Sequence, residues 1–334
     1  MSDVITTRRE GTILEVTLDR PKANAIDLKT SRLMGETFKA FRDDPGLRVA
    51  IVKTAGDKFF CAGWDLKAAA GGDAVDGDYG VGGFGGLQEL RDLNKPVVAC
   101  VNGMAVGGGF ELALSCDLIY ASDHSSFALP EIRAGTLADA ATIKLPKRIP
   151  YHVAMDLLLT GRWMDVAEAH RWGLVNEVLP KDRLGDRVWE IARLLADGPP
   201  LVFAAIKETA RIAESLTFQD AMNRVTRRQL PTVDALYGSE DNLEGFRAFA
   251  EKRDPVWKGN DPAEMMAFLP TPLWPAGHLP LKGGDWQLRP IHPSCRAGDW
   301  RKPMGHPISP LEGEMAGRTE GGAQADSLRS VQFP

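Results

Sequence analysis

Three short, almost entirely apolar runs lie in the N-terminal half of the chain, at residues 49–52, 97–101 and 118–121. Runs of four or five apolar residues are too short for buried helices and are typical of strands that are covered on both faces. Between the strand regions, Asp27 is predicted to cap a helix whose apolar residues recur at helical spacing, namely Leu28, Leu33, Met34, Phe38 and Phe41. This alternation predicts a layered α/β domain.

The remaining elements follow the same two periodicities. Residues 12–18 place Leu14, Val16 and Leu18 on one face and predict a half-buried strand. A short helix is expected at 110–114, and an apolar strand at 127–132 is expected to carry Glu131 at its end. From residue 150 helical spacing dominates, with one last strand at 174–179; the expected helices span residues 153–159, 166–172, 184–195, 201–212, 221–230 and 242–252.

Composition limits the classes of protein that need to be considered. The chain has 334 residues, 44% hydrophobic and 25% charged, which allows a large core and excludes global disorder. A net charge of −5 argues against nucleic acid as a partner. The most apolar stretch, residues 96–121, contains Asn102, Glu111 and Asp117, so no membrane-spanning helix is expected. Four widely spaced cysteines and an N-terminus without an apolar region favour a cytoplasmic protein without disulfides or a metal site.

The last seventy residues differ from the rest. Half of the 22 prolines lie between residues 262 and 334, and residues 309–327 are polar and rich in glycine. Most of the segment 264–334 is therefore predicted to be extended or disordered. The alternative is a small docked arm anchored by Trp274, Trp286 and Trp300.

Three consecutive glycines, Gly107 to Gly109, follow a predicted buried strand and open a predicted helix. Glycine lets the backbone approach a ligand closely, and the free N–H groups at a helix start can hold an oxygen that becomes negative. The turn at residues 60–66 could supply a second main-chain donor. Tight packing of strand against helix explains the glycines equally well.

Glu111 and Glu131 are the candidate acid–base residues. Each is an acid in or beside an apolar stretch, where a carboxylate costs desolvation energy unless it is paired or functional. A first-turn helix acid for Glu111, and a surface acid paired with Arg133 for Glu131, are the structural alternatives. Two such acids beside a glycine-rich turn favour a paired acid–base site.

Other motifs do not support a different chemistry. Residues 80–85 match G-x-G-x-x-G, but they follow a polar loop instead of a strand and are interpreted as a mobile loop. The chain has no nucleotide-binding P-loop and no G-x-S-x-G. Asp139 is expected to be a helix N-cap, or else a third acid of the site.

Taken together, residues 62–66, residues 102–113 and residues 127–131 resemble the crotonase (enoyl-CoA hydratase/isomerase) superfamily, over roughly residues 10–260. Residues 19–27, 62–69 and 251–259 are similar, more narrowly, to its carnitinyl-CoA dehydratase branch. The resemblance implies a spiral of ββα units in residues 1–195, a helical trimerisation region in 196–263 and an irregular extension in 264–334. It also implies assembly as a trimer or a dimer of trimers.

The resemblance further implies how the site is built. The main-chain N–H groups of Trp64 and Gly108 would hold the thioester oxygen, and Glu111 and Glu131 would be the catalytic carboxylates, with Glu111 acting chiefly on water and Glu131 on the α-proton. Coenzyme A is part of the substrate and not a separate cofactor. It would run along five residues: Lys22, Ala23, Ala62, Asp65 and Leu66. Trp64 and Phe84 could face a trimethylammonium acyl group, or simply pack the pocket.

The expected activity is that of an acyl-CoA hydro-lyase, with crotonobetainyl-CoA and carnitinyl-CoA as a candidate pair. The alternatives are an enoyl-CoA isomerase or other crotonase activity, and a catalytically silent CoA-binding or RNA-binding relative. One stretch departs from the family pattern: residues 135–142 lack the proline and the two later glycines that relatives usually carry after the second glutamate.

Overall fold

The computed structural model describes residues 4–74 and 77–259. The chain divides into two units, residues 1–271 and 272–334, and every described residue belongs to the first. The predicted disorder or docking of residues 264–334 therefore lies outside the described residues. In the described part, no helix is long and apolar enough to cross a membrane.

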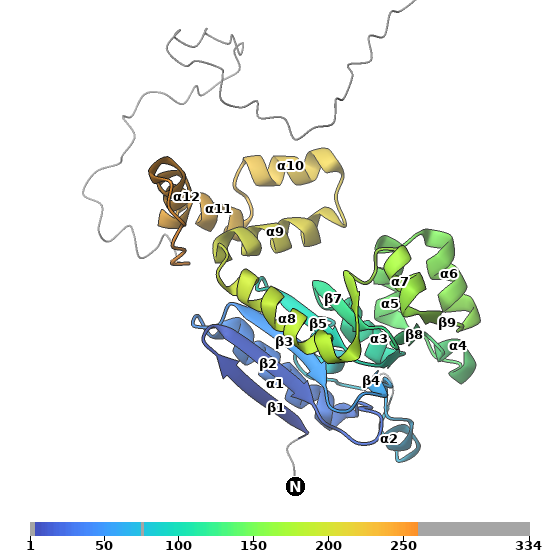
Figure 1. The fold of residues 1–334 in the computed structure, drawn as a ribbon. Coiled ribbons are helices and arrows are strands. Elements are labelled where there is room, and N and C mark those ends of the chain that lie inside the picture. Colours follow the sequence, from blue (N-terminus) through green and yellow to red (C-terminus); the bar gives the residue numbers. More distant parts are fainter. Residues whose placement is uncertain (1–3, 75–76, 260–334) are drawn as a thin grey trace, which may run out of the picture. The chain divides into compact units, whose positions relative to one another are not determined.

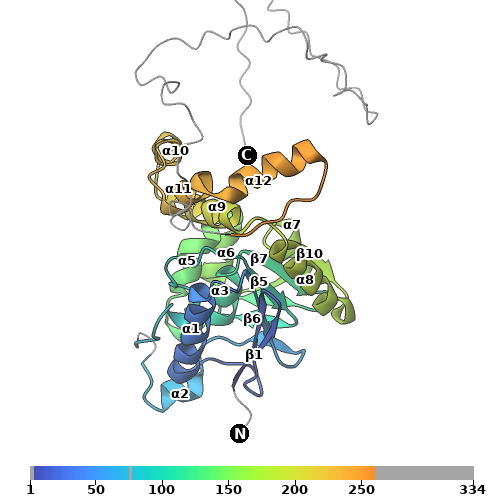
Figure 2. The ribbon, with the colours of Figure 1, turned by 90° about the vertical axis from the view of Figure 1, so that its left-hand side faces the viewer.

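A six-stranded sheet forms the centre of the fold (Figures 1 and 2), with the order β1-β2-β3-β5-β7-β10. Its strands are β1 (Ile5–Glu10), β2 (Ile13–Leu18), β3 (Val49–Thr54), β5 (Val97–Val101), β7 (Leu118–Ser122) and β10 (Glu177–Leu179). Only β1 is antiparallel to its neighbour; the other pairs are parallel. The three apolar runs are β3, β5 and β7, as predicted.

Both faces of this sheet are covered. Leu14, Val16 and Leu18 pack into the larger core cluster with the apolar residues of α1 (Leu28–Asp43) and α3 (Gly108–Leu114). Ile13 on the opposite face packs against α8 (Lys181–Ala196), which covers the sheet with Leu184, Val188 and Ala192. The prediction of a half-buried strand at 12–18 is wrong for this reason. Even Glu15 is only 7% exposed, and it accepts a hydrogen bond from Trp189 Nε1 at 3.0 Å.

A second, smaller sheet has the order β4-β6-β8-β9 and strands of three residues each: β4 (Phe59–Cys61), β6 (Met104–Val106), β8 (Ser126–Ala128) and β9 (Trp163–Asp165). Strands β4, β6 and β8 run parallel, so their carboxyl ends lie at one edge. The predicted strand at 127–132 is thus too long. It ends at Ala128, and Glu131 instead begins the four-residue helix α4.

The helices predicted from the sequence are present, although most of their first and last residues differ from the predicted ones. Asp27 caps α1 by accepting from Thr30 N at 2.7 Å. Asp139, expected as a cap, is instead the first residue of α5, and Ala138 occupies the cap position. The remaining helices are α2 (Leu66–Ala70), η1 (Phe84–Gly86), α4 (Glu131–Ala134), α5 (Asp139–Lys144), η2 (Leu145–Lys147), α6 (Tyr151–Thr160), α7 (Val166–Arg171), α9 (Pro200–Ala213), α10 (Phe218–Thr226), α11 (Pro231–Gly238) and α12 (Glu240–Glu251).

Polar groups connect the C-terminal region, residues 200–259, to the segments that precede β7 and β3. Lys207 of α9 pairs with Asp117 at 2.6 Å, and Arg48 donates to the carbonyl oxygen of Trp257 at 2.7 Å. Several large apolar side chains of this region are exposed in the single chain: Phe218 (81%), Phe246 (70%), Phe249 (80%) and Val256 (67%).

The glycine-rich segment 80–86 is packed and not a mobile loop. Gly82 to Gly86 are buried, and Ser31 Oγ of α1 donates to Gly83 O and accepts from Gly85 N, both at 3.1 Å. A Cβ at Gly35 of α1 would overlap the carbonyl oxygen of Val81. The glycines allow this segment to lie directly on α1, where it carries Phe84 toward the site.

We expect Gly35→Ala to lower the free energy of unfolding by about 1–3 kcal/mol, because its methyl group must displace the backbone at Val81. Gly185→Ala in α8 is the matched control. No atom lies within 4 Å of its added Cβ, so this change should leave stability unchanged or raise it by up to about 1 kcal/mol. Urea denaturation followed by circular dichroism measures both, and equal effects would contradict this packing.

Candidate active site

Three segments of the site leave the carboxyl ends of neighbouring parallel strands. The turn 62–64 follows β4, Gly107 and Gly108 follow β6, and Glu131 follows β8 by three residues. The register Ala105↔Phe127 and Val106↔Ala128 fixes the last two against each other. Carboxyl ends of parallel strands are common ligand sites, because the chain turns away there and leaves main-chain groups free.

The glycines are required by close contacts. A Cβ at Gly107, whose φ is +54°, would lie 2.5 Å from Glu131 Oε1, and one at Gly108 would lie 2.5 Å from the Phe84 ring. A Cβ at Gly109 would overlap the Cys61 carbonyl. Gly63 is required for the same reason, because a Cβ added there would lie 2.9 Å from Gly108 N. The turn 62–64 and the start of α3 are therefore in direct contact.

The main-chain N–H groups of Trp64 and Gly108 are available for a ligand. Among the described residues, neither has a protein acceptor. The Trp64 turn is held from behind, because Ile26 N donates to Gly63 O at 2.8 Å and Asp65 N donates to Ile26 O at 3.0 Å. Two fixed donors on adjacent turns can stabilise an oxygen that gains negative charge.

Glu111, in the first turn of α3, is 5% exposed. Its two carboxylate oxygens accept from separate donors: Oε1 from Ala141 N at 2.8 Å and Oε2 from Gln88 Nε2 at 3.0 Å. Burial raises its pKa, and these two hydrogen bonds act against that rise by stabilising the charged form. Ala141 belongs to the stretch that departs from the family pattern, so that stretch holds Glu111 in place.

Glu131 has a different environment. Its Oε2 is buried and lacks a hydrogen-bond partner within the described residues. Burial raises the pKa of Glu131 to about 7, and the nearby charges of Glu111 and Asp139 add to the rise. Glu131 is therefore the acid of the pair that more readily carries a proton near neutral pH.

One cavity of about 380 Å³ joins these groups. Trp64, Gly108, Glu111 and Glu131 all line it, together with Ala62 and Leu66. Its lining also includes Tyr79, Phe84, Gln88, Glu89, Gly107, Pro130, Arg133, Ala134, Thr136, Leu137 and Asp139. Trp64, Tyr79 and Phe84 form an aromatic wall in which Tyr79 meets Trp64 and Phe84 edge-on, with ring centroids 5.4 and 5.5 Å apart.

Three of the residues expected to contact coenzyme A do not line this cavity: Lys22, Ala23 and Asp65. Asp65 caps α2 by accepting from Lys67 N at 2.9 Å, and it pairs with Arg20 at 2.6 Å. Its carboxylate thus has a structural role in holding the turn. Ala23 accepts from Ala62 N at 3.0 Å, which places it behind the same turn. The exposed Lys22 remains free to meet a bound ligand's outer part.

The structure adds residues that the sequence did not indicate. Gln88 and Tyr79 lie in or beside a glycine-rich segment without periodicity, so nothing local marked them as neighbours of Glu111 and Trp64. Asp139, considered as a third acid, does line the cavity. The indole Nε1 of Trp64 is buried without a partner among the described residues, and it is a further donor in this region.

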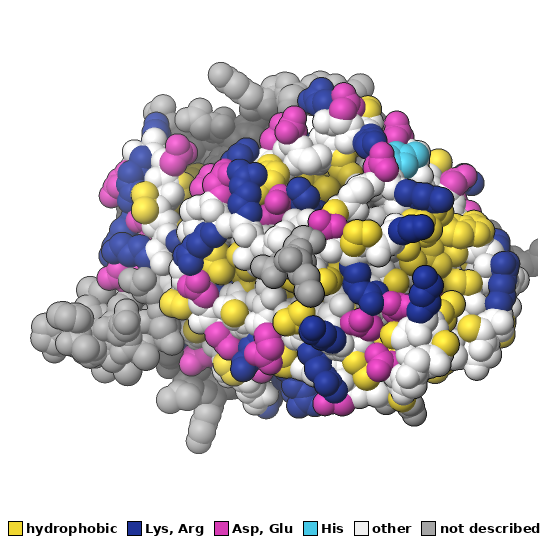
Figure 3. All heavy atoms as spheres, turned by 90° about the horizontal axis from the view of Figure 1, so that it is seen from below, with side chains coloured by type: hydrophobic (Ala, Val, Ile, Leu, Met, Phe, Trp, Pro, Cys, Tyr) yellow, Lys and Arg dark blue, Asp and Glu magenta, His cyan; other side chains and the backbone are white. Residues whose placement is uncertain are grey.

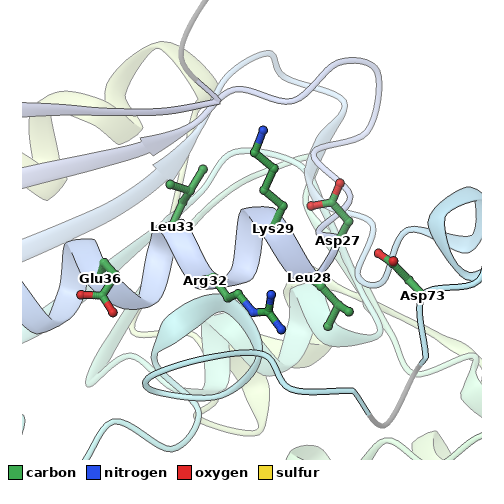
Figure 4. Close-up of a pocket in the computed structure, with 7 residues that line it drawn as sticks. All are labelled: Asp27, Leu28, Lys29, Arg32, Leu33, Glu36 and Asp73. Carbon is green, nitrogen blue, oxygen red and sulfur yellow. The ribbon is translucent and has the colours of Figure 1, made fainter.

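A second hollow lies along the N-terminal half of α1 (Figure 4) and brings no comparable chemistry together. Lys29 and Arg32 point to different sides of the helix, and Arg32 already donates to Asp78 O at 2.8 Å. Asp27 is occupied by capping α1 and by Arg20. Across the described residues, no group of three His, Cys, Asp or Glu is arranged to hold a metal ion.

Residues 8–260 match the model of the enoyl-CoA hydratase/isomerase family. The carnitinyl-CoA dehydratase of Salmonella arizonae is 54% identical over 261 residues, which cover 78% of this chain and 100% of that protein. The carnitinyl-CoA dehydratase of Proteus mirabilis is 53% identical over 256 residues, covering 76% of this chain and 97% of the relative.

Solved structures give the same result. An enoyl-CoA hydratase from Mycobacterium marinum superposes with a TM-score of 0.70 at 36% identity, covering 77% of this chain and 99% of the other. An enoyl-CoA hydratase from Bacillus anthracis gives a TM-score of 0.70 at 28% identity, covering 77% and 100%. The expectation of a crotonase-like α/β fold is confirmed.

The raised pKa of Glu131 predicts one carboxyl group that stays protonated up to neutrality. A raised pKa means that the neutral acid persists below it, so the carboxylic-acid stretching band should be present at about pH 6 and lost as the pH rises through about 7. Infrared titration of the wild type against Glu131→Gln tests this, with the exposed Glu36→Gln as control. A band that survives in Glu131→Gln and disappears in Glu111→Gln would reverse the assignment.

Proposed function

The chain belongs to the enoyl-CoA hydratase/isomerase family and is an enoyl-CoA hydratase-like lyase, and we propose that Glu111 and Glu131 move the protons while the Trp64 and Gly108 amides hold the thioester oxygen. The observation that carries this proposal is the shared cavity, in which two acids with different hydrogen-bond environments meet two free main-chain donors.

The first step is activation of the thioester. Its carbonyl oxygen accepts hydrogen bonds from the two amides and gains negative charge as the enolate forms. Each such donor lowers a barrier by about 3–4 kcal/mol where it has been measured. Because both donors are main-chain groups, the Trp64 side chain remains available to shape the acyl pocket.

The second step is the addition of water. Ionised Glu111 takes a proton from water while the water oxygen bonds to Cβ, and protonated Glu131 gives its proton to Cα. Dehydration is the reverse: Glu131 removes the α-proton, and Glu111 protonates the departing hydroxyl. The pair of acids therefore holds one proton in total. That proton is on Glu131 before hydration and on Glu111 before dehydration. The hydrogen bonds to Glu111 and the unpartnered oxygen of Glu131 favour the first arrangement.

We propose carnitinyl-CoA as the hydroxyacyl substrate and crotonobetainyl-CoA as the dehydrated product. Two relatives with that dehydratase name support this choice. The cavity supports it independently. The acyl group carries a trimethylammonium ion, which is attracted by aromatic faces and by carboxylates. The lining offers the aromatic wall of Trp64, Tyr79 and Phe84. It also includes the carboxylates of Glu89 and Asp139, and Arg133 is a cation in the same lining.

We also propose that the chain assembles as a trimer or a dimer of trimers. The exposed apolar side chains of α10 and α12 support this, because patches of this kind usually mark protein interfaces. Further apolar residues gather toward the right of the face shown in Figure 3, among lysines and arginines. A monomeric mass in light scattering would contradict the proposal.

Glu111→Gln and Glu131→Gln should each lower turnover of crotonobetainyl-CoA by at least about a hundredfold, because each removes one proton-transfer group. Loss of the enoyl-thioester absorbance, with identification of the product, measures the reaction. Glu36→Gln on the exposed face of α1 is the control and should keep wild-type turnover. Near-normal rates in either active-site variant would contradict the assigned roles, and an inactive wild type would contradict the activity.

Tyr79→Leu should lower the preference for crotonobetainyl-CoA over uncharged crotonyl-CoA, because it removes one aromatic face from the wall. A cation–π contact of about 0.5–2 kcal/mol corresponds to a change of about two- to thirtyfold in the ratio of the two kcat/KM values. Tyr79→Phe keeps the face and should keep most of the preference. An unchanged ratio in Tyr79→Leu would remove this residue from the proposed ammonium site.

A further inference from the structure

Lys144 is a half-buried cation that the proposed mechanism does not use. It is the last residue of α5, the helix whose first turn holds Glu111 through Ala141 N. Its ammonium group donates to Ser115 Oγ at 2.9 Å and to Gln88 O at 3.4 Å. It does not line the active-site cavity.

Both partners of Lys144 also contact Glu111. Ser115 Oγ donates to the main-chain oxygen of Glu111 at 2.8 Å, and Gln88 Nε2 donates to its carboxylate at 3.0 Å. The ammonium group is therefore connected to Glu111 by hydrogen bonds in two ways, once through Ser115 and once through Gln88. Lys144 joins α5, α3 and the Gln88 segment behind the catalytic carboxylate.

The charge of Lys144 has no direct partner. In the described part of the chain, no carboxylate oxygen lies within ion-pair distance of its Nζ. Burial lowers the pKa of Lys144, and the charged or titratable neighbours that act on it are Cys116, Glu111, Arg148 and Glu214. Burial raises the pKa of the Cys116 thiol, which is therefore neutral in the physiological range.

Glu214 is already neutralised. It pairs with Arg148 at 2.7 Å and with Lys147 at 3.3 Å. Glu111 is thus the remaining anion that can offset the positive charge of Lys144. A partly buried cation is retained at low cost only where an anion or hydrogen bonds compensate it.

We propose that Lys144 is a positioning residue that acts through Glu111, keeping the carboxylate ionised and held by Gln88 so that it can accept a proton from water. The inference rests on the proposed function, since it requires Glu111 to be the base. Asp139 opposes the ionised form of Glu111 by its negative charge, and Lys144 is the cation that acts against it.

The pH profile of crotonyl-CoA hydration tests this role. Lys144→Met removes a positive charge that stabilises ionised Glu111, so the pKa of Glu111 should rise. The acid limb of the kcat/KM profile should therefore move to higher pH by about 0.5–1 pH unit. At pH values on the acid limb, turnover should then fall roughly three- to tenfold, whereas the rate above the limb and the KM should change little. Lys144→Arg keeps the charge, so the acid limb of its pH profile should lie at the same pH as in the wild type.

Lys147→Met is the matched control. Lys147 is a neighbouring lysine that pairs with Glu214 and not with Glu111, so its removal should leave the acid limb in place. If Lys144→Met does not fold, Lys144→Gln, which retains a donor for Ser115, takes its place.

The outcomes separate the two levels of the proposal. A loss of activity by the same factor at every pH would mean that Lys144 only holds α5 and α3 together, which overturns the inference. If Glu111→Gln retains turnover, the proposed function itself fails. If Glu111→Gln is inactive but Lys144→Met keeps its acid limb, the role of Lys144 alone is wrong.

Discussion

The whole site depends on a backbone segment that has no room for side chains. Residues 107–109 pass between the carbonyl oxygen of Cys61 on one side and the Phe84 ring and Glu131 carboxyl on the other, and an added Cβ at any of the three would be too close to its neighbour. The parallel pairing of β4, β6 and β8 brings their carboxyl ends to one edge, and this close contact joins the turns that follow the strands. Without it, the amides of Trp64 and Gly108 would not face the same cavity as the two acids.

The two acids differ because their surroundings differ, although both are glutamates within one cavity. Glu111 has a donor on each oxygen and a cation behind it, whereas Glu131 leaves one oxygen buried without a partner. Low-dielectric surroundings amplify such differences, since a missing hydrogen bond is not replaced by water. The pKa of Glu131 is raised to about 7 in these surroundings, and the proposed acid–base addition across the double bond would use such a difference between the two acids.

Much of the fold could be predicted from local patterns, because the apolar runs of β3, β5 and β7 are buried on both faces, where an unpaired polar side chain is costly. Glu111 was recognisable for the same reason, as an acid inside an apolar run. The strands of the smaller sheet have three residues each, too few for any periodicity to appear. Gln88 and Tyr79 could not be assigned, because their importance arises only from contacts with residues distant in the chain. The glycines at 82–86 predict flexibility locally, yet in the fold they permit burial against α1.

Trp64 contributes to the site twice, once through its amide and once through its ring. These two contributions are independent, because every residue except proline would supply the same N–H at position 64. Replacement of the side chain can therefore change which acyl group is accepted without removing either of the two main-chain donors proposed to hold the thioester oxygen. An enzyme built in this way can acquire a new substrate by single substitutions in its pocket, while the reaction itself is inherited intact.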